Sequence, residues 1–319
     1  MSCKVAAGLA ATEPMTDTVP MIDKLEMLLA LAREQHFGRA AEACGITQPT
    51  LSAGLKQLEE SVGVLLVQRR SRFIGFTPEG LRVLDWARRI VGDTRAMRDE
   101  IRALKRGLAG HLRIAAVPTA LPIVASLTTP LHVGHPEIGF TILSRTSIEV
   151  LTLLDNLEVD AGLTYVDNEP LGRVRSIPLY HEHYRLLIST DRTLGDRDTV
   201  TWAEVGRIPL CLLTPDMQNR RIIDRRLRQA GVEQAPTLQS NSMVVLFSHV
   251  RTGRWASVMP AVLAETMGIA APIRAIPIED PEPSPTIGLV YPQREPMTPL
   301  TAALVAEAHR LGGKWMANG

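Results

Sequence analysis

The chain has 319 residues, of which 45% are hydrophobic and 22% are charged, as in ordinary soluble globular proteins of two or three domains. Its formal net charge of +1 does not by itself indicate a nucleic-acid partner. No uninterrupted apolar run approaches the roughly 18 residues that a membrane-spanning helix needs. The three cysteines, Cys3, Cys44 and Cys211, lack a CxxC spacing, which argues against a disulfide framework and favours a reducing cytoplasm.

The first twenty residues show no hydrophobic periodicity, and we expect residues 1–20 to form a disordered tail. Their apolar stretch is broken by Gly8 and Thr12, so they do not have the pattern of a signal peptide. Residues 21–35 then predict a helix with one apolar face, formed by Leu25, Leu28, Leu29 and Ala32.

Residues 37–72 have the pattern of a helix-turn-helix followed by a wing. The first helix carries Ala40, Ala41 and Cys44 on its apolar side. Gly45 follows, and glycine suits the left-handed conformation that commonly ends a helix. The chain is therefore expected to turn here, before a second helix begins.

Thr47 can cap this second helix, Pro49 fits its first turn, and Gly63 is expected to end it. Its buried face recurs at spacings of four, three and four residues, through Leu51, Leu55, Leu58 and Val62. The opposite face carries mostly short or polar side chains, namely Gln48, Thr50, Ser52, Ala53, Lys56 and Gln57. Such a face on the second helix of the motif fits the major groove of DNA.

The residues after this helix predict a short basic wing. Val64–Val67 is an apolar strand, Arg69–Gly75 the turn and Phe76 the return strand. Arginines on a wing commonly neutralise phosphates and carry little sequence information. The predicted DNA contacts are Thr47, Gln48, Pro49, Thr50, Ser52, Ala53, Lys56, Arg69, Arg70 and Arg72.

Residues 78–106 predict one long helix with an a/d heptad seam between charged positions. The seam consists of Val83, Ala87, Ile90, Thr94, Met97, Ile101 and Leu104. So narrow an apolar stripe favours pairing with a second copy of the helix, although packing on its own domain is the alternative. A two-fold dimer would place two reader helices on two half-sites of DNA.

Beyond residue 110 the chain alternates strands and helices. Strands are expected at 112–117, 138–143, 159–165, 184–189, 208–213 and 255–260. A helix is expected at 147–156, a loop at 277–285 and a closing helix at 300–315. This alternation predicts an α/β fold whose parallel sheet is covered by helices on both faces.

The helix-turn-helix resembles that of LysR-type transcriptional regulators, through HFGRAAEACGITQPTLSAGLKQLEESVGVLLVQRR (36–70) and FTPEG (76–80). The run ACGITQPTLS is most similar to the peroxide-sensing branch, whereas Ala53 and Val67 depart from the family pattern. The resemblance implies a winged helix-turn-helix domain at 21–80, a dimerising linker helix at 78–108 and an effector-binding domain at 111–319. This last domain is expected to resemble periplasmic binding proteins, with lobe I at 111–181 and 287–319 and lobe II at 182–286.

The same resemblance implies that a small effector binds between the lobes, where positions matching Thr119 and Thr146 commonly contact it. Ligands of open α/β sheets bind beyond the carboxyl ends of strands, where these hydroxyls are expected, although each hydroxyl could instead only cap its own helix. Arg145 indicates an anionic effector if it faces the cleft, and is otherwise a solvated surface residue. The predicted effector contacts are Thr119, Ser144, Arg145, Thr146, Thr164, Thr214, Met217 and Ser242.

The residues do not favour redox sensing or catalysis. A thiol switch needs two cysteines within reach, and residues 216–219, in the segment that resembles the family's sensor loop, contain none. No GxSxG, HExxH, P-loop or strand-linked GxGxxG motif is present. The HEH run at 181–183 supplies only an isolated histidine pair, so no metal and no cofactor other than an effector is expected.

The sequence therefore predicts a cytoplasmic LysR-type regulator, not an enzyme, that binds double-stranded promoter DNA and a small-molecule effector. A homodimer through the linker helix and a homotetramer through the effector domains are expected, with RNA polymerase as a candidate partner. The alternative interpretation is a solute-binding protein with the periplasmic-binding-protein fold. The helix-turn-helix argues against that alternative.

Overall fold

The computed structural model describes residues 19–69, 73–167, 170–233, 235–281 and 283–316. Most of the predicted tail, together with Arg70 and Arg72, lies outside the described residues, as does the side chain of Arg69. The chain forms two compact units, Met1–Val91 and Gly92–Gly319. No helix of the described residues is both long enough and apolar enough to span a membrane.

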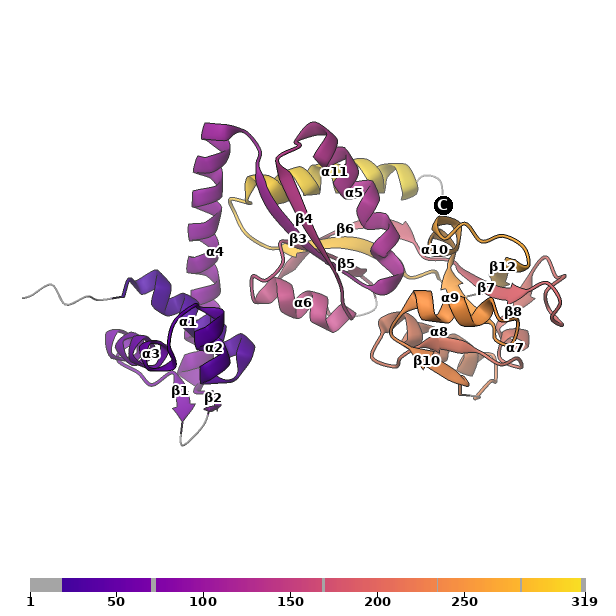
Figure 1. Ribbon diagram of the computed structural model, residues 1–319, viewed down its shortest axis with the longest axis horizontal. Coiled ribbons are helices and arrows are strands. Elements are labelled where there is room, and N and C mark those ends of the chain that lie inside the picture. The colour runs from indigo at the N-terminus through magenta and orange to yellow at the C-terminus, as the bar shows by residue number, and fades with distance from the viewer. Residues whose placement is uncertain (1–18, 70–72, 168–169, 234, 282, 317–319) are drawn as a thin grey trace, which may run out of the picture. The chain divides into compact units, whose positions relative to one another are not determined.

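The first unit is a three-helix core with a two-stranded wing (Figure 1). Its elements are α1 (Met21–Glu34), α2 (Phe37–Ala43), α3 (Gln48–Val62), β1 (Val67–Arg69), β2 (Phe73–Phe76) and the start of α4 (Pro78–Arg106). Leu28 and Leu31 of α1 and Leu51 and Leu55 of α3 are fully buried. Gly54 makes this packing close, because a Cβ there would overlap the Sδ atom of Met27.

The helix-turn-helix has the predicted ends, but three neighbouring predictions are wrong. Gly45 and Gly63 adopt positive φ, and Thr47 caps α3 by accepting from the Thr50 N–H. Val62, however, is 40% exposed, so the buried face of α3 ends one turn earlier, at Leu58. The first wing strand begins at Val67 and not at residue 64, and the side chains of Val64 and Leu65 are exposed. The return strand begins at Phe73, within the predicted turn, and not at Phe76.

The FTPEG segment fixes the start of α4. The hydroxyl of Thr77 accepts from the Gly80 N–H (2.8 Å) and donates to the Leu65 carbonyl oxygen (2.7 Å), so it caps the helix and anchors the wing. Gly80 has no room for a side chain, since a Cβ would overlap the Leu66 carbonyl oxygen. The 29-residue helix matches the prediction at both ends.

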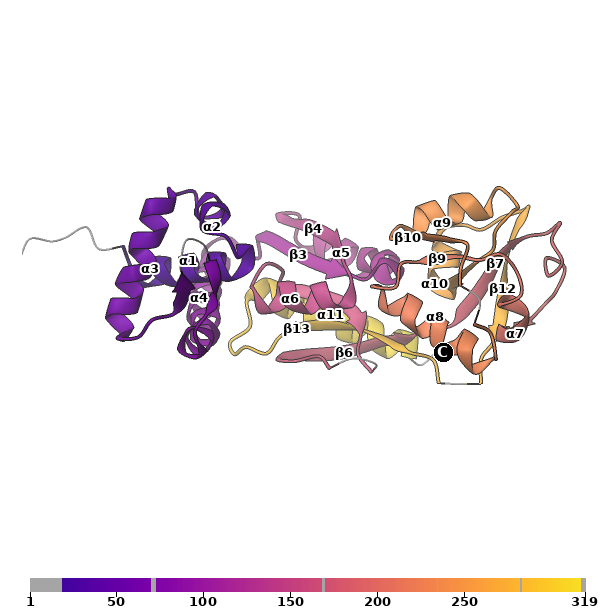
Figure 2. The ribbon, with the colours of Figure 1, turned by 90° about the horizontal axis from the view of Figure 1, so that it is seen from below.

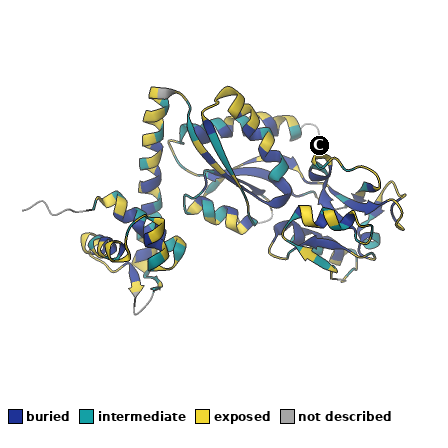
Figure 3. Ribbon diagram, in the orientation of Figure 1, coloured by how far each residue is buried: buried dark blue, intermediate teal, exposed yellow. Residues whose placement is uncertain are grey.

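Several seam positions of α4 face solvent in the single chain (Figure 3). Ile90 is 42%, Met97 54%, Ile101 48% and Leu104 82% exposed, whereas Ala87 is fully buried. Because the seam is apolar and exposed at these positions, pairing with a second copy of the helix stays a prediction. Packing within the single chain therefore leaves these four positions uncovered.

The second unit contains two lobes, which we define by their sheets. Lobe I is built on a five-stranded sheet of order β4-β3-β5-β13-β6. Its elements are β3 (Gly110–Ala116), η1 (Pro118–Ala120), α5 (Leu121–Gly134), β4 (Ile138–Ser144), α6 (Ser147–Asp155), β5 (Ala161–Tyr165), β6 (Val174–His181), β13 (Thr286–Pro292) and α11 (Pro299–Met316). Helices α5 and α11 cover one face of this sheet and α6 covers the other (Figure 1).

Lobe II is built on a four-stranded sheet of order β11-β7-β12-β8 and a parallel β10-β9 pair. Its elements are β7 (Tyr184–Ser189), β8 (Val200–Thr201), α7 (Trp202–Val205), β9 (Cys211–Leu213), α8 (Gln218–Gln229), β10 (Leu238–Ser240), α9 (Met243–Val250), β11 (Ser257–Pro260), α10 (Ala261–Thr266) and β12 (Ile273–Glu279). Figure 2 shows α8 and α9 on opposite sides of the strands. Two connections, residues 182–183 and 280–285, join the lobes.

The predicted α/β architecture is confirmed, but the four-stranded and five-stranded sheets are mixed and not parallel. Strands β3, β4 and β5 run parallel, whereas β13 returns from lobe II and pairs antiparallel with both β5 and β6. In lobe II, β7 pairs antiparallel with β11 and β12. The predicted strand at 208–213 is shorter, beginning at Cys211, and the predicted loop at 277–285 begins only after β12 ends at Glu279.

Candidate DNA-binding face and effector cavity

The N-terminal half of α3 presents the predicted polar face to solvent. Gln48, Pro49, Thr50, Ala53 and Lys56 are exposed, and Ser52 is half-buried. The hydroxyls of Thr47 and Thr50 lie 2.9 Å apart, so both take part in the cap as well as standing on this face. Lys56 lies 3.6 Å from the carboxylate of Glu60, an exposed pair that leaves the ammonium group accessible.

A buried carboxylate joins the reader helix to the wing. Glu59 on α3 is 6% exposed, and its Oε1 accepts from the backbone N–H groups of Leu66 (3.0 Å) and Val67 (3.1 Å). Phe73 of β2 packs edge-on against Phe37 of α2, with ring centroids 6.3 Å apart. The wing is therefore held to both helices of the motif. Sequence reasoning missed Glu59, because a lone glutamate in an amphipathic helix gives no sign of burial.

A cavity of about 530 Å³ lies between loops of lobe I and lobe II. It is lined by Pro118, Leu121, Ser144, Arg145, Thr146, Glu149, Asp216, Met217, Asn241, Ser242, Met243 and Val244. Five of the eight predicted effector contacts belong to this lining, namely Ser144, Arg145, Thr146, Met217 and Ser242. Its volume is in the range of sites that hold small ligands.

The cavity lining carries charges of both signs. Arg145 donates to the Ser144 carbonyl oxygen (2.8 Å), while Glu149 accepts from the Thr146 N–H (2.8 Å) in the capping box of α6. Asp216 is exposed at the rim. The first turns of α8 and α9 receive no side-chain cap, so their N–H groups add partial positive charge on the lobe II side.

Three predicted effector contacts are not part of this lining. Thr119 is fully buried, and its hydroxyl lies 3.4 Å from the phenolic oxygen of Tyr165. Thr164 is 1% exposed on β5, and the hydroxyl of Thr214 is also buried. Thr146 lines the cavity and also caps α6, so the capping interpretation holds for it together with the cavity position.

Two family models match this chain. The model of the bacterial regulatory helix-turn-helix protein, lysR family, matches residues 22–81, and the model of the LysR substrate binding domain matches residues 105–312. The chain belongs to the LysR family. It is a LysR-type DNA-binding transcriptional regulator with an effector-binding domain, and the interpretation as a solute-binding protein is not favoured.

Relatives and solved structures agree with this LysR assignment. A hydrogen peroxide-inducible genes activator of Dickeya chrysanthemi is 28% identical over 277 residues, covering 86% of this chain and 90% of the relative. A full-length OxyR variant from Pseudomonas aeruginosa superposes with a TM-score of 0.71 at 25% identity, covering 92% and 99% of the two chains. CbnR in complex with its target DNA shares the fold, with a TM-score of 0.58 at 20% identity over 92% and 100% of the chains.

The cysteines of this LysR regulator lie in different surroundings. Cys211 is fully buried on β9, and burial raises the pKa of its thiol to about 11. Cys44, predicted on the apolar side of its helix, follows the last residue of α2 and is only half-buried, and burial also raises the pKa of its thiol. A raised pKa leaves little thiolate, which is the reactive form. Cys3 lies outside the described residues.

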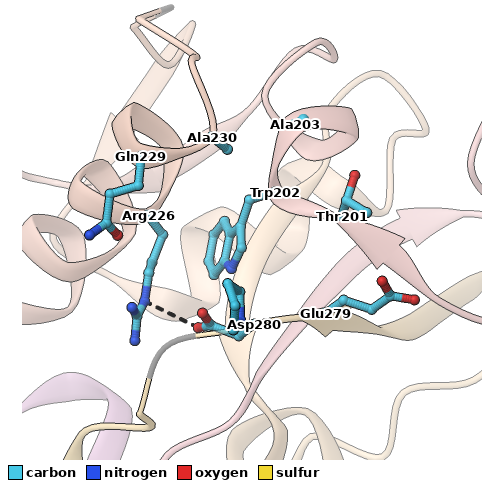
Figure 4. Close-up of a pocket in the computed structure, with 9 residues that line it drawn as sticks. Thr201, Trp202, Ala203, Arg226, Gln229, Ala230, Glu279 and Asp280 are labelled. Atoms are coloured by element: carbon cyan, nitrogen blue, oxygen red, sulfur yellow. Dashed lines mark ion pairs between the residues drawn. The ribbon is translucent and has the colours of Figure 1, made fainter.

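A second, larger cavity of about 710 Å³ lies within lobe II and contains none of the predicted residues (Figure 4). Arg226 and Asp280 form an ion pair of 3.1 Å beside Trp202 in its wall. Arg226 also donates to the Pro283 carbonyl oxygen (2.8 Å). These bonds tie α8 to the connection that leads back to lobe I.

Proposed function

We propose that this LysR regulator binds promoter DNA through the exposed face of α3, with Thr47, Gln48, Pro49, Thr50, Ser52, Ala53 and Lys56 as contacts. Short polar side chains in the first turns of the second helix are those that reach base edges in this motif. Arg69, Arg70 and Arg72 are proposed to contact phosphates from the wing. The exposure of Gln48 and Thr50 beside a buried leucine face is the observation that supports this proposal most.

The cavity between the lobes is the proposed effector site, with Ser144, Arg145, Thr146, Met217 and Ser242 as its contacts. Thr119, Thr164 and Thr214 do not line the cavity, and they are proposed to support the residues that do. An anionic group would be attracted by Arg145 and the uncapped turns of α8 and α9. Since Asp216 also lines the cavity, a small polar molecule with both a carboxylate and an amine fits the charges better than a simple anion.

We further propose that the protein acts in the cytoplasm as a homodimer through residues 78–108 and as a homotetramer through its effector domains. The domain limits are those implied by the family resemblance, and RNA polymerase is the proposed partner in transcription. The exposed seam of Ile90, Met97, Ile101 and Leu104 supports the dimer, because an apolar stripe of this kind is covered in a coiled coil. The protein is proposed to have no catalytic activity, as its family consists of regulators.

The relative from Dickeya chrysanthemi is named a hydrogen peroxide-inducible genes activator. We do not propose that this chain senses peroxide by forming a disulfide. Cys211 is buried in an apolar strand, and its Sγ lies 3.6 Å from the Leu246 carbonyl oxygen. Such a thiol is unfavourable as a nucleophile.

A thermal-shift screen of small metabolites on the full-length protein tests the effector proposal, because a ligand that binds only the native state raises its melting temperature. A compound that stabilises the protein should lose most of this effect in Arg145→Gln and keep it in Arg254→Gln, a matched change at an exposed position of lobe II. Equal stabilisation of both variants would place the ligand outside the cavity.

A further inference from the structure

Glu182 lies at the junction between the two lobes. It belongs to residues 182–183, which connect β6 of lobe I to β7 of lobe II. Its backbone N–H donates to the carbonyl oxygen of Pro285 (2.8 Å), which lies on the returning connection. Its side chain is 1% exposed, although a lone carboxylate is rarely found so deeply buried.

One oxygen of this carboxylate holds groups from both lobes. Oε2 accepts from the hydroxyl of Tyr165 on β5 (2.7 Å) and from the hydroxyl of Tyr184 on β7 (3.0 Å). The phenolic oxygen of Tyr165 also accepts from the side-chain amide of Asn219 on α8 (3.5 Å) and lies beside Thr119 of η1. Lobe I thus supplies Tyr165 and Thr119, and lobe II supplies Tyr184 and Asn219.

The other oxygen has no such partner. Glu182 Oε1 and the Asn219 side-chain oxygen are both buried without a hydrogen-bond partner among the described residues. Two acceptors that lack donors in one closed cluster are unfavourable, and a proton on Oε1 would turn one of them into a donor. This polar cluster also adjoins the effector cavity, because Pro118 and Met217 line the cavity and Thr119 and Asn219 follow them closely in the chain.

The electrostatic surroundings favour the neutral carboxyl. Burial raises the pKa of Glu182 to about 7, while hydrogen bonds from the neutral side chains of Tyr165, Tyr184, Thr119 and Asn219 lower it. Burial also raises the pKa of both tyrosines, and that of Tyr180 on β6, so the phenols remain protonated donors.

The titratable side chains on the adjoining connection and on α8 have partners other than Glu182. His181 and His183 are exposed and lie within hydrogen-bond distance of Thr286 and Ser284. On α8, Arg220 pairs with Asp224 (2.7 Å), and Arg221 donates to Ser147 of lobe I (3.4 Å). The largest influences on the Glu182 pKa include no cation. A negative charge at this position is therefore stabilised only by neutral donors.

We propose that Glu182 is a positioning residue of the lobe junction, whose proton is retained when the junction is closed and released when the lobes move apart. The neutral carboxyl fits the buried cluster, whereas the carboxylate gains more from water in an opened junction. The inference rests on the proposed function, and adds to it that DNA binding is switched by a rearrangement of the two lobes. It makes that switching depend on pH near neutrality, in addition to the effector.

Two measurements on the full-length protein test this proposal, using Glu182→Gln and the matched control Glu265→Gln, which changes an exposed glutamate of α10. Glutamine keeps the shape and an acceptor but cannot titrate. In the first, melting temperature is followed from about pH 5.5 to about pH 8.5. Because the folded pKa is raised, the native state binds more protons than the unfolded chain in this window, and stability falls as pH rises. As pH rises, the melting temperatures of the wild type and of Glu265→Gln should therefore fall relative to that of Glu182→Gln.

In the second measurement, affinity for DNA from upstream of its own gene is followed over the same pH range at constant salt. A single linked proton permits a change of at most about tenfold per pH unit. The wild type and Glu265→Gln should show this dependence around neutrality, and Glu182→Gln should lose it. Tyr184→Phe, which keeps the carboxyl and removes one donor, should move the transition to higher pH.

The outcomes separate this inference from the proposed function. If the melting temperature depends on pH in the same way in Glu182→Gln and in the control, the claim that Glu182 holds a proton in the folded protein is overturned. If the melting temperatures of Glu182→Gln and the control depend differently on pH but their DNA affinities depend on pH in the same way, the link between the Glu182 proton and the lobe arrangement is overturned. If no variant binds the upstream DNA at any pH, the proposed function fails, and the melting curves still decide whether Glu182 titrates.

Discussion

Replacing Glu59 by alanine should loosen the wing from the reader helix without changing any DNA contact directly. The substitution leaves the N–H groups of Leu66 and Val67 without their acceptor, to which they donate at the ordinary distances of 3.0 and 3.1 Å. Hydrogen bonds to a charged group contribute about 1.5–3 kcal/mol each, and an unpaired buried donor costs about 1–3 kcal/mol. Since one oxygen serves both donors, we expect a combined loss of about 3 kcal/mol.

Hydrogen exchange of the full-length protein measures this loss locally. An energy of about 3 kcal/mol corresponds to roughly a hundredfold change in an equilibrium constant, so the amides of Leu66 and Val67 should exchange about a hundred times faster in Glu59→Ala. Glu60→Ala is the control, since the neighbouring Glu60 is exposed and forms only a surface pair with Lys56. Unchanged protection of these two amides in Glu59→Ala, or an equal loss in the control, would refute the reasoning.

Three further predictions concern the DNA face, the seam and the thiols. Gln48→Ala should lower operator affinity by about 1–3 kcal/mol and leave binding to random DNA nearly unchanged, and an equal loss on both would show that Gln48 does not read bases. Ile90→Asp should yield monomers in sedimentation, because it places an unpaired charge in an apolar seam, and an intact dimer would contradict the seam. A variant with serine at Cys44 and Cys211 should still respond to its inducer, and loss of induction in a well-folded variant would revive redox sensing.

Local signals made the first unit readable from sequence. Pro78 and Gly107 mark the ends of α4, and Gly45, Thr47 and Gly63 mark the ends of the reader helix. Each of these residues affects the backbone within a few positions of itself, so the local sequence alone is enough to identify the helix end. The exposed Val64 and Leu65 show the limit, because an apolar pair next to a strand was predicted to belong to it.

Long-range contacts account for most of what the sequence did not predict. The antiparallel strand β13 pairs with β5 across more than a hundred residues, and no local pattern specifies its direction. The loops of Ser144–Thr146 and Ser242 line one cavity, and their role as effector contacts stays a prediction. Thr119 was predicted to contact the effector, but its hydroxyl lies 3.4 Å from the phenolic oxygen of Tyr165. The position of Tyr165 in the fold could not be inferred from sequence spacing. Glu182 was noted only within HEH.

Footprinting of the purified full-length protein on DNA from upstream of its own gene tests the central claim most directly. A two-fold regulator that reads DNA with α3 should protect two half-sites separated by a whole number of helical turns, and protection should be lost in Gln48→Ala at matched protein concentration. Adding a compound that stabilises the protein through the cavity should change the spacing or extent of protection. Uniform, sequence-independent protection that is the same in the wild type and in Gln48→Ala would contradict the account.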